Sequence, residues 1–325
     1  MMDWTDRHCR YFHRLLSRHA LLYTEMVTTG ALIHGDVPRH LDFNPEEQPV
    51  ALQLGGSEPA DLALAARLGA KWGYQEINLN CGCPSERVQR GAFGACLMAE
   101  PQLVADGVKA MKDAVDIPVT VKHRIGIDRG ESYDFVRDFV GTVAQAGCQH
   151  FIVHARNAWL EGLSPKENRE IPPLKPEWVL RLKHDFPDLQ FVINGGITSS
   201  EQIAQHLGEL DGVMVGREAY HRPWFISEWD SLMGHPTDPL EMNQVEARMV
   251  DYMTQQAKQG VGWFAVSRHM LGLRHGQPGA RRWRQVWSDH RLKDRPATEV
   301  AQLAREALTT ATQHPVLAGS TAGQA

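Results

Sequence analysis

The 325-residue sequence has no long apolar run, no paired set of cysteines and no strong compositional bias. Its apolar runs span only a few residues, whereas a membrane helix needs roughly 20, so no membrane span is expected. The N-terminus reaches charged residues at once, without the basic and apolar regions of a secretory signal, and this indicates a cytoplasmic protein. With 42% hydrophobic and 22% charged residues, the composition excludes a disordered or fibrous chain.

The five cysteines are too few and too unevenly spaced for a disulfide framework. Cys81 and Cys83 would need a second ligand pair to hold zinc, and the remaining cysteines do not supply one, so no metal site is predicted. Cys83 precedes a proline directly after a predicted strand, a position that suits an acid or a nucleophile. Cys96 lies among apolar residues and is expected to pack as a small hydrophobic side chain.

The formal net charge of −5 is unevenly distributed along the chain. Residues 240–325 carry 11 Lys and Arg against 7 Asp and Glu, so residues 1–239 carry a net charge of −9. Eight of the basic residues lie between positions 268 and 295, with Trp283 and Trp287 interleaved. Arg281 and Arg284 are three apart and would share one helical face. The pattern favours a polyanionic partner for this region, with a solvated helix surface as the simpler alternative.

Short β-rich runs alternate with amphipathic segments up to about residue 229. Strands are predicted at Leu21–Met26, Pro49–Leu54, Glu76–Asn80, Ile117–Lys122, His150–His154, Phe191–Asn194 and Gly212–Val215. Helices are predicted between them at Ala60–Leu68, Pro101–Ala114, Tyr133–Ala146, Trp178–Asp185 and Glu201–Leu207. This alternation implies an α/β fold with a parallel sheet. A (β/α)8 TIM barrel fits best, with its first strand truncated, because only seven strands can be read.

Two prolines and a glycine in residues 233–239 interrupt both periodicities and mark a domain boundary. We expect the barrel over residues 1–235, a small all-α helical bundle over residues 240–316 and a frayed tail over residues 317–325. The bundle helices are predicted at Asn243–Gln259, Trp263–Leu273, Gly279–Asp289 and Ala297–Thr310. Near the N-terminus, Thr5 is expected to cap a helix that runs through Leu16.

Polar residues recur at the predicted carboxyl ends of the strands, where barrel enzymes carry their catalytic groups. Each could be a solvated strand end, but their recurrence at one end favours a site. The last two clusters pair glycines with helix starts, which is typical of a phosphate-binding site. In chain order, the candidates are Gln53, Asn78, Asn80, Cys83, Lys122, Arg124, His154, Arg156, Asn194, Gly195, Gly196, Gly216 and Arg217.

Long stretches of this sequence resemble the tRNA-dihydrouridine synthases, specifically their A subfamily, and the resemblance covers nearly the whole chain. It implies an N-terminal FMN-binding barrel and a C-terminal helical domain that binds tRNA. It further implies that FMN reduced by NADPH reduces uridine to dihydrouridine in the D-loop, at positions 20 and 20a. The stretches are Glu76–Met98, Val119–Asp128, Phe151–Leu174, Ile193–Ile197 and Asp211–Tyr220.

The same resemblance implies roles for individual residues. Cys83 matches the catalytic acid that gives a proton to C5 while flavin N5 gives a hydride to C6, and Cys81 stands where a valine is expected. The flavin-ring contacts match Gln53, Lys122 and His154, and the phosphate contacts match Asn194, Gly195, Gly196, Gly216 and Arg217. Contacts to tRNA match Asn80, Lys166 and Arg169, and the helical face with Arg281 and Arg284 is expected to add to them.

Two alternatives to this interpretation stay open at the level of sequence. A free-pyrimidine flavoprotein dehydrogenase would share the flavin barrel and the cysteine, but it would have no use for a basic helical domain. A non-catalytic RNA-binding barrel protein would have lost its flavin contacts, which are intact here. No obligate protein partner is expected.

The count of strands leads to a further expectation about the start of the chain. Members of the resembled family carry a short apolar strand ending in Ala-Pro-Met before the equivalent of Met2–Asp6. We therefore expect the natural chain to begin about ten residues upstream, where such a strand would complete the barrel of eight.

Overall fold

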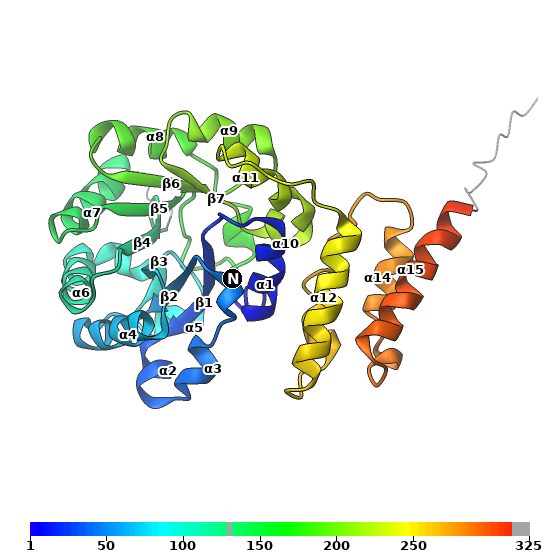
Figure 1. Cartoon of the computed structure of the whole chain (residues 1–325). Coiled ribbons are helices and arrows are strands. Elements are labelled where there is room, and N and C mark those ends of the chain that lie inside the picture. The colour runs from blue at the N-terminus through cyan, green and yellow to red at the C-terminus, as the bar shows by residue number, and fades with distance from the viewer. Residues whose placement is uncertain (129–131, 314–325) are drawn as a thin grey trace, which may run out of the picture.

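The computed structural model describes residues 1–128 and 132–313, with side chains up to residue 309. The predicted tail at 317–325 lies outside the described residues. Seven parallel strands form one curved sheet in the order β1 to β7 (Figure 1). They are β1 (Leu22–Thr28), β2 (Val50–Gly55), β3 (Glu76–Cys81), β4 (Val119–Arg124), β5 (His150–His154), β6 (Gln190–Asn194) and β7 (Gly212–Met214). All seven predicted strands are confirmed, each to within two residues at either end.

Helices line the outside of the curved sheet, as a TIM-barrel fold requires (Figure 1). The larger ones are α4 (Pro59–Trp72), α6 (Pro101–Ala114), α7 (Tyr133–Gln145), α8 (Pro176–Asp185) and α9 (Ser200–Leu207), all near their predicted positions. Shorter ones are α2 (Thr29–His34), α3 (Val37–Leu41), α5 (Glu86–Arg90), α10 (Arg217–His221) and α11 (Trp229–Leu232). No helix among the described residues is long and apolar enough to cross a membrane.

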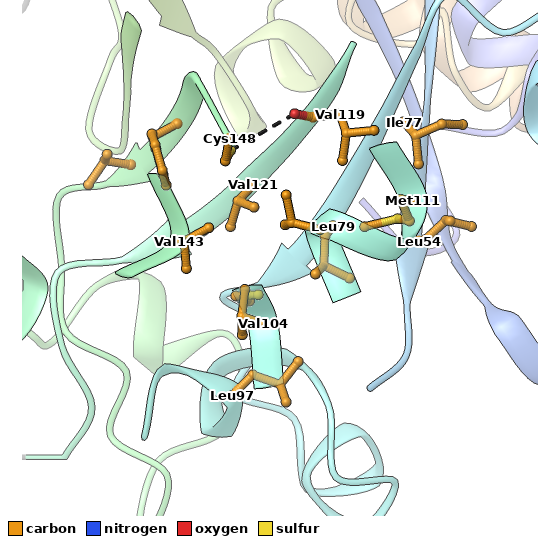
Figure 2. Close-up of a cluster of buried hydrophobic side chains, with 14 of the residues drawn as sticks. Leu54, Ile77, Leu79, Leu97, Val104, Met111, Val119, Val121, Val143 and Cys148 are labelled. Atoms are coloured by element: carbon orange, nitrogen blue, oxygen red, sulfur yellow. Dashed lines mark hydrogen bonds between the residues drawn. The ribbon is translucent and has the colours of Figure 1, made fainter. Parts of the chain in front are cut away.

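The apolar core of this domain lies between the strands and the surrounding helices. Successive strand residues point to opposite faces, so Val119 and Val121 face outward while Thr120 between them faces inward. Figure 2 shows the outward valines of β4 together with Leu79 of β3, Val104 and Met111 of α6. These side chains are almost completely buried. The inner face of the sheet is thereby left to a different set of side chains, many of them polar.

The two outer strands of the sheet are not hydrogen-bonded to each other, because β1 pairs with β2 and β7 with β6. Residues 1–4 lie between them. The backbone N–H of Asp3 donates to Glu25 of β1, and the sulfur of Met1 lies 3.7 Å from the position of a Cβ on Gly216, which follows β7. Helix α1 (Arg7–Leu16) follows. Its N-cap is Asp6, not the predicted Thr5, because the Asp6 carboxylate accepts the backbone N–H groups of His8 and Cys9 in the first turn.

The C-terminal region is a bundle of helices, as predicted: α12 (Met242–Ala257), α13 (Trp263–Ser267), α14 (Ala280–Trp287) and α15 (Ala297–Gln313). The helix predicted to reach Leu273 is shorter than expected, because α13 ends at Ser267 and the chain continues in turns. It has its own buried core, which Phe12 and Leu16 of α1 also join. Glu246 is buried at its centre and accepts the indole N–H groups of Trp283 and Trp287 at 2.9 and 3.1 Å. The two tryptophans that interleave with the basic residues therefore form core, and they do not face a partner.

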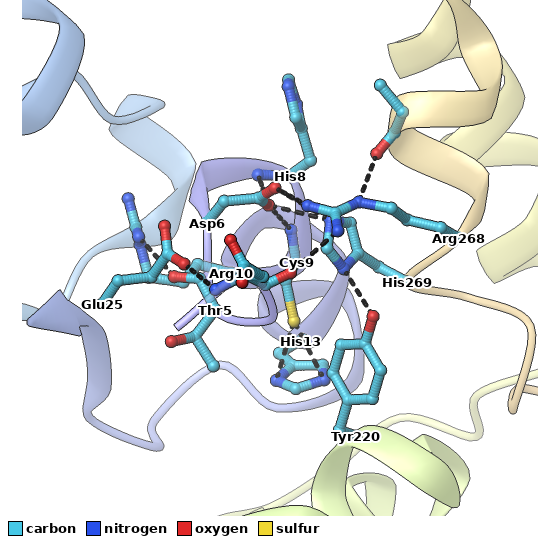
Figure 3. A network of polar contacts seen from close by, with 12 residues as sticks. Thr5, Asp6, His8, Cys9, Arg10, His13, Glu25, Tyr220, Arg268 and His269 are labelled. Carbon is cyan, nitrogen blue, oxygen red and sulfur yellow. Dashed lines mark hydrogen bonds and ion pairs between the residues drawn. The ribbon is translucent and has the colours of Figure 1, made fainter. Parts of the chain in front are cut away.

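A polar network joins α1, the barrel and the helical bundle (Figure 3). The Asp6 carboxylate accepts a hydrogen bond from Arg268 at 2.7 Å and contacts Nε2 of His269 at 3.0 Å. On the other side of its ring, Nδ1 of His269 lies 3.2 Å from the Tyr220 hydroxyl of α10. Trp4 stacks on Tyr220 with the ring centroids 4.5 Å apart. The guanidinium of Arg268 therefore binds the N-cap of α1 within the molecule.

Candidate functional site

The carboxyl ends of the strands bring the predicted site residues side by side. Strand register places Asn80 beside Lys122 across β3 and β4, and it places His154 beside Asn194 across β5 and β6. Gln53, one strand earlier, donates from Nε2 to Asn78 and accepts from Asn80, each at 2.8 Å. One end of the sheet therefore presents a continuous row of polar side chains, as the sequence predicted.

Cys83 is held at the edge of this row by the loop after β3. Asn80 Oδ1 accepts the backbone N–H groups of Gly82 and Cys83 at 3.0 and 2.9 Å. The carbonyl of Cys83 accepts the N–H of Ala95 at 2.9 Å. Close packing here requires glycine at Gly94, whose φ is +78° and whose added Cβ would lie 2.7 Å from that carbonyl oxygen. The loop is fixed on both sides, with the half-buried thiol of Cys83 3.6 Å from the Ser85 hydroxyl.

The neighbouring cysteines differ from Cys83 in their surroundings. Cys81 is fully buried in the apolar core, and this burial raises the pKa of its thiol far above the ordinary value. Cys96 is half-buried, and its thiol donates to the carbonyl of Phe93 at 3.1 Å. Cys96 therefore makes a polar contact in addition to the apolar packing that the sequence predicted. Cys83, by contrast, lies close enough to Lys122 and Arg124 to interact with their charges.

Cations gather at this end of the barrel with few anions to balance them. Lys122 donates to the neutral amide oxygen of Asn194 at 3.1 Å, and burial, followed by repulsion from Arg124, lowers the pKa of Lys122 to about 8. Arg124 binds only carbonyl oxygens in the described structure, and burial lowers its pKa to about 10. Burial and these cations hold the pKa of His154 well below its ordinary value, so His154 is neutral. Such a site favours an anionic ligand.

Three more guanidinium groups lie next to this cluster, around a single loop. Arg217 donates to the Glu170 carboxylate at 2.7 Å and to the carbonyl of Arg169 at 3.1 Å. Arg156 donates to the backbone carbonyls of Glu170 and Pro172. Nε of Arg156 and Nε of Arg169 are buried and have no hydrogen-bond partner in the described structure. Buried donors of this kind are normally satisfied, so these two are available to a ligand.

The glycines after β6 adopt conformations that other residues avoid. Gly195 has φ +110° and Gly196 has φ +73°. A Cβ on Gly195 would lie 2.6 Å from the His154 ring, and one on Gly196 would lie 2.5 Å from Leu174. Backbone N–H groups can approach a ligand closely at such a turn. Gly216 immediately precedes α10, whose first residue is Arg217.

The predicted RNA contacts are divided between two surfaces. Lys166 is exposed beside a short 3-10 turn (Glu167–Arg169), whereas Arg169 is half-buried in the guanidinium cluster. Arg281 and Arg284 are exposed on α14, on the side away from its buried tryptophans. One of the basic residues counted between positions 268 and 295 cannot contact RNA. Arg274 is buried, and its guanidinium binds Glu246 at 2.7 Å.

Sequence reasoning noted Arg124 and Arg156 at the strand ends without giving them a role, and it missed Glu170 and Thr120. Glu170 lies in an irregular loop, where no periodicity indicates which side chains face the site. Thr120 alternates with two valines in a predicted strand, and nothing in this pattern indicates a role at the site. The described residues contain no group of three or more metal-ligating side chains.

Comparison with known proteins gives a consistent result. The family model described as dihydrouridine synthase matches residues 1–312. The chain is 56% identical over 306 residues to the tRNA-dihydrouridine(20/20a) synthase of Vibrio vulnificus, covering 94% of each chain. It is 58% identical over 289 residues to the tRNA-dihydrouridine(20/20a) synthase of Pseudomonas aeruginosa, covering 89% of this chain and 87% of the relative. These matches confirm the resemblance seen in the sequence, and the chain belongs to the dihydrouridine synthase family.

Proposed function

We propose that this chain reduces uridine to 5,6-dihydrouridine at positions 20 and 20a of the tRNA D-loop, with FMN as its cofactor and NADPH as the electron donor. The observation that carries the proposal is the cation-rich end of the barrel, where Lys122, Arg124 and Arg169 lie close enough to the thiol of Cys83 to interact with it. The relatives named above carry the positions 20 and 20a in their names.

The residues at this end of the barrel fit FMN. Gly195, Gly196 and Gly216 would offer backbone N–H groups to its phosphate, and Arg217 would add a charge-assisted hydrogen bond. Asn194 lies at the base of this turn, with its amide donating to the carbonyl of Met214 at 2.8 Å. The unpartnered guanidinium nitrogens beside Arg217 are further donors for an anion.

The remaining contacts would lie along the flavin ring. Gln53 is held by hydrogen bonds to Asn78 and Asn80, and the His154 ring lies next to Gly195; both side chains would contact the ring edge. Lys122 would lie beside the N1/C2=O edge, where an ammonium group stabilises the negative charge of reduced flavin. In the described structure the Lys122 ammonium donates to a neutral amide, so this buried charge gains most from such an anion.

Bound FMN, once reduced by NADPH, supplies the hydride that C6 of the uracil receives. Cys83 then acts as the general acid, and its Sγ gives the proton to C5, so hydride and proton together saturate the C5=C6 bond. Asn80 and Ala95 hold the backbone of Cys83, and this keeps the thiol at the edge of the site. The uridine must leave its stack to reach the thiol, which costs a few kcal/mol and is easiest in a loop.

Residues 1–235 would form the catalytic domain in this scheme, and residues 240–316 would bind tRNA. Lys166, Arg169 and Asn80 would contact the tRNA near the target uridine. Arg281 and Arg284 would meet phosphates farther away, from the exposed side of α14.

The proposed function is tested on the purified protein and in cells. We expect a yellow protein that absorbs near 450 nm, and we expect dihydrouridine at positions 20 and 20a of tRNA to disappear when the gene is deleted and to return with it. A protein that stays colourless after reconstitution with FMN, or tRNA with unchanged dihydrouridine, would contradict the proposal. Reduction of free uracil but not of tRNA would favour the pyrimidine dehydrogenase alternative.

The pKa of Lys122 predicts how FMN binding depends on pH. The free protein loses the ammonium charge as pH rises through about 8, whereas the acceptor atoms at the N1/C2=O edge of bound FMN and its negatively charged phosphate favour the charged form. Binding above pH 8 must therefore take up a proton, so affinity falls as pH rises. We expect the Kd for FMN to be about tenfold higher at pH 9 than at pH 7, measured by quenching of flavin fluorescence.

The control for this prediction is Lys122→Met, which keeps an unbranched side chain one atom shorter and removes the charge. It should bind FMN more weakly at pH 7 and show a nearly flat profile between pH 7 and 9. A wild-type profile that is flat, or one that persists in Lys122→Met, would assign the charge contact to another residue.

Exposed arginines on α14 predict the salt dependence of tRNA binding. Each phosphate contact contributes about 0.7 to 0.9 to the slope of log K against log salt. We expect Arg281→Ala with Arg284→Ala to lower the slope by about 1.5 and to weaken binding at low salt, without changing FMN content. Arg305→Ala, on α15, is a control for net charge alone. An unchanged slope in the double variant would exclude this face.

A further inference from the structure

The interior of the barrel is polar at a depth where a TIM barrel normally packs branched apolar side chains. Glu76, Asn78 and Asn80 point inward from alternate positions of β3, and Thr120 points inward from β4. Asn78 is fully buried and Thr120 nearly so. Strand register places Asn78 between Gln53 and Thr120. Such a layer lowers stability unless every polar atom has a partner.

These side chains form one continuous series of hydrogen bonds. From the thiol loop inward, the N–H of Cys83 donates to Asn80 at 2.9 Å and Asn80 donates to Gln53 at 2.8 Å. Gln53 then donates to Asn78 at 2.8 Å, and Asn78 donates to Thr120 at 2.8 Å. The series, which we call the relay, ends where Thr120 donates to the Glu76 carboxyl at 2.7 Å.

The direction of the relay is fixed at both of its ends. A backbone N–H can only donate, so the Asn80 atom that meets Gly82 and Cys83 is the oxygen, and its amide nitrogen must donate onward. At the inner end the Oε1 of Glu76 accepts from both Tyr23 and Thr120. A threonine hydroxyl has one proton, so Thr120 must accept from Asn78. The two amides between the ends therefore have one orientation each.

We propose that Thr120, with Glu76 and Asn78, is a positioning element that sets the amide orientation of Gln53 and holds the Cys83 loop. The inference rests on the proposed function, since it concerns the cofactor contact of Gln53 and the proton donor. Thr120 does not touch the reacting atoms. It acts through four hydrogen bonds in series, and breaking the series frees Gln53 and Asn80 to rotate.

Two substitutions at Thr120 separate positioning from packing. Thr120→Val keeps the side-chain volume and removes the hydroxyl, whereas Thr120→Ser keeps the hydroxyl and removes a methyl group. We expect Thr120→Val to lower kcat for tRNA about tenfold or more with the KM for tRNA within twofold, because small misplacements of reacting groups are costly. It should also raise the Kd for FMN severalfold. Thr120→Ser should keep kcat near wild type even where its melting temperature is lower.

Hydrogen exchange of the free protein gives a readout that needs neither cofactor nor substrate. In Thr120→Val the amides of Gly82 and Cys83 should exchange about fivefold to tenfold faster, as expected for one weakened hydrogen bond. The amides of α6 should not change. Tyr23→Phe removes the other donor to Glu76 without breaking the relay, and it should leave the exchange of Gly82 and Cys83 unchanged.

These measurements decide whether Thr120 positions the site or only contributes to stability. Wild-type kcat and exchange in Thr120→Val would overturn the proposal, and so would losses that follow the melting temperatures of both Thr120 variants. If Thr120→Val does not fold, Glu76→Leu removes the acceptor of the Thr120 hydroxyl, so the direction of the Thr120–Asn78 hydrogen bond is no longer fixed. The amides of Gly82 and Cys83 should then also exchange faster than in the wild type. If the wild type forms no dihydrouridine in tRNA, the proposed function fails, and the exchange of Gly82 and Cys83 still decides whether the relay holds the loop.

Discussion

Replacing Cys83 with alanine is expected to slow the reduction of uridine in tRNA at least 100-fold while FMN stays bound and reducible by NADPH. The reason is that loss of a general acid usually costs roughly 10²–10⁴ in rate, and only the step that protonates C5 needs the thiol. The backbone N–H and carbonyl of Cys83 hold the loop, and alanine keeps both. Stopped-flow spectroscopy at 450 nm measures the two half-reactions separately.

Two matched variants test the choice of cysteine. Cys81→Val fills a fully buried position with the residue expected from the family resemblance, and Cys96→Ala removes a thiol that donates only to a backbone carbonyl. Both should turn over at nearly the wild-type rate. If Cys81→Val stops turnover and Cys83→Ala does not, the proton donor has been assigned to the wrong thiol.

Periodicity alone predicted the barrel, because a parallel sheet covered by helices requires apolar strands separated by amphipathic helices. The positions of the site residues followed from the same pattern. Parallel strands end at one edge, so Gln53, Lys122 and His154 had to lie together once their strands were located. The resemblance to a known family then added the roles that geometry cannot supply.

Other features depend on contacts between distant parts of the chain, and the sequence does not reveal them. Arg274 counted as a basic surface residue, yet it is buried against Glu246, because charge alone does not show which helical face packs inward. The spacing of Trp283 and Trp287, four residues apart, was the signal that this face is core. Helix α1 belongs to the first residues of the chain, but its apolar side completes the core of the C-terminal bundle.

The polar layer inside the barrel also depends on contacts between residues that are distant in the sequence. The sequence marks Asn78 as a polar residue near a strand end and gives no sign that Thr120 belongs with it, and only the strand register shows that the two are neighbours. Their hydrogen bonds connect the core to the loop that carries Cys83. Stability and catalysis are therefore expected to be linked through this layer, although the apolar core between strands and helices is separate from it.

Replacing Gly195 with alanine is expected to weaken FMN binding about 100-fold. Gly195 has φ +110°, which alanine avoids at a cost of about 1–3 kcal/mol, and the new Cβ would lie 2.6 Å from the His154 ring. In the free variant the turn relaxes to relieve this strain, and FMN binding must restore it, so the strain energy subtracts from the binding free energy. A cost of about 3 kcal/mol corresponds to roughly two powers of ten in Kd, since each 1.4 kcal/mol is tenfold.

Gly260→Ala separates this effect from general backbone strain. Gly260 follows α12 with φ +83°, and an added Cβ there would meet nothing within 4 Å. It should lower the melting temperature by a few degrees, as expected for about 1 kcal/mol of strain, and leave the Kd for FMN unchanged. Equilibrium dialysis of both variants against FMN measures the difference. Wild-type affinity in Gly195→Ala would show that this turn does not hold the phosphate, and the guanidinium groups around Arg217 would then have to hold it without the turn.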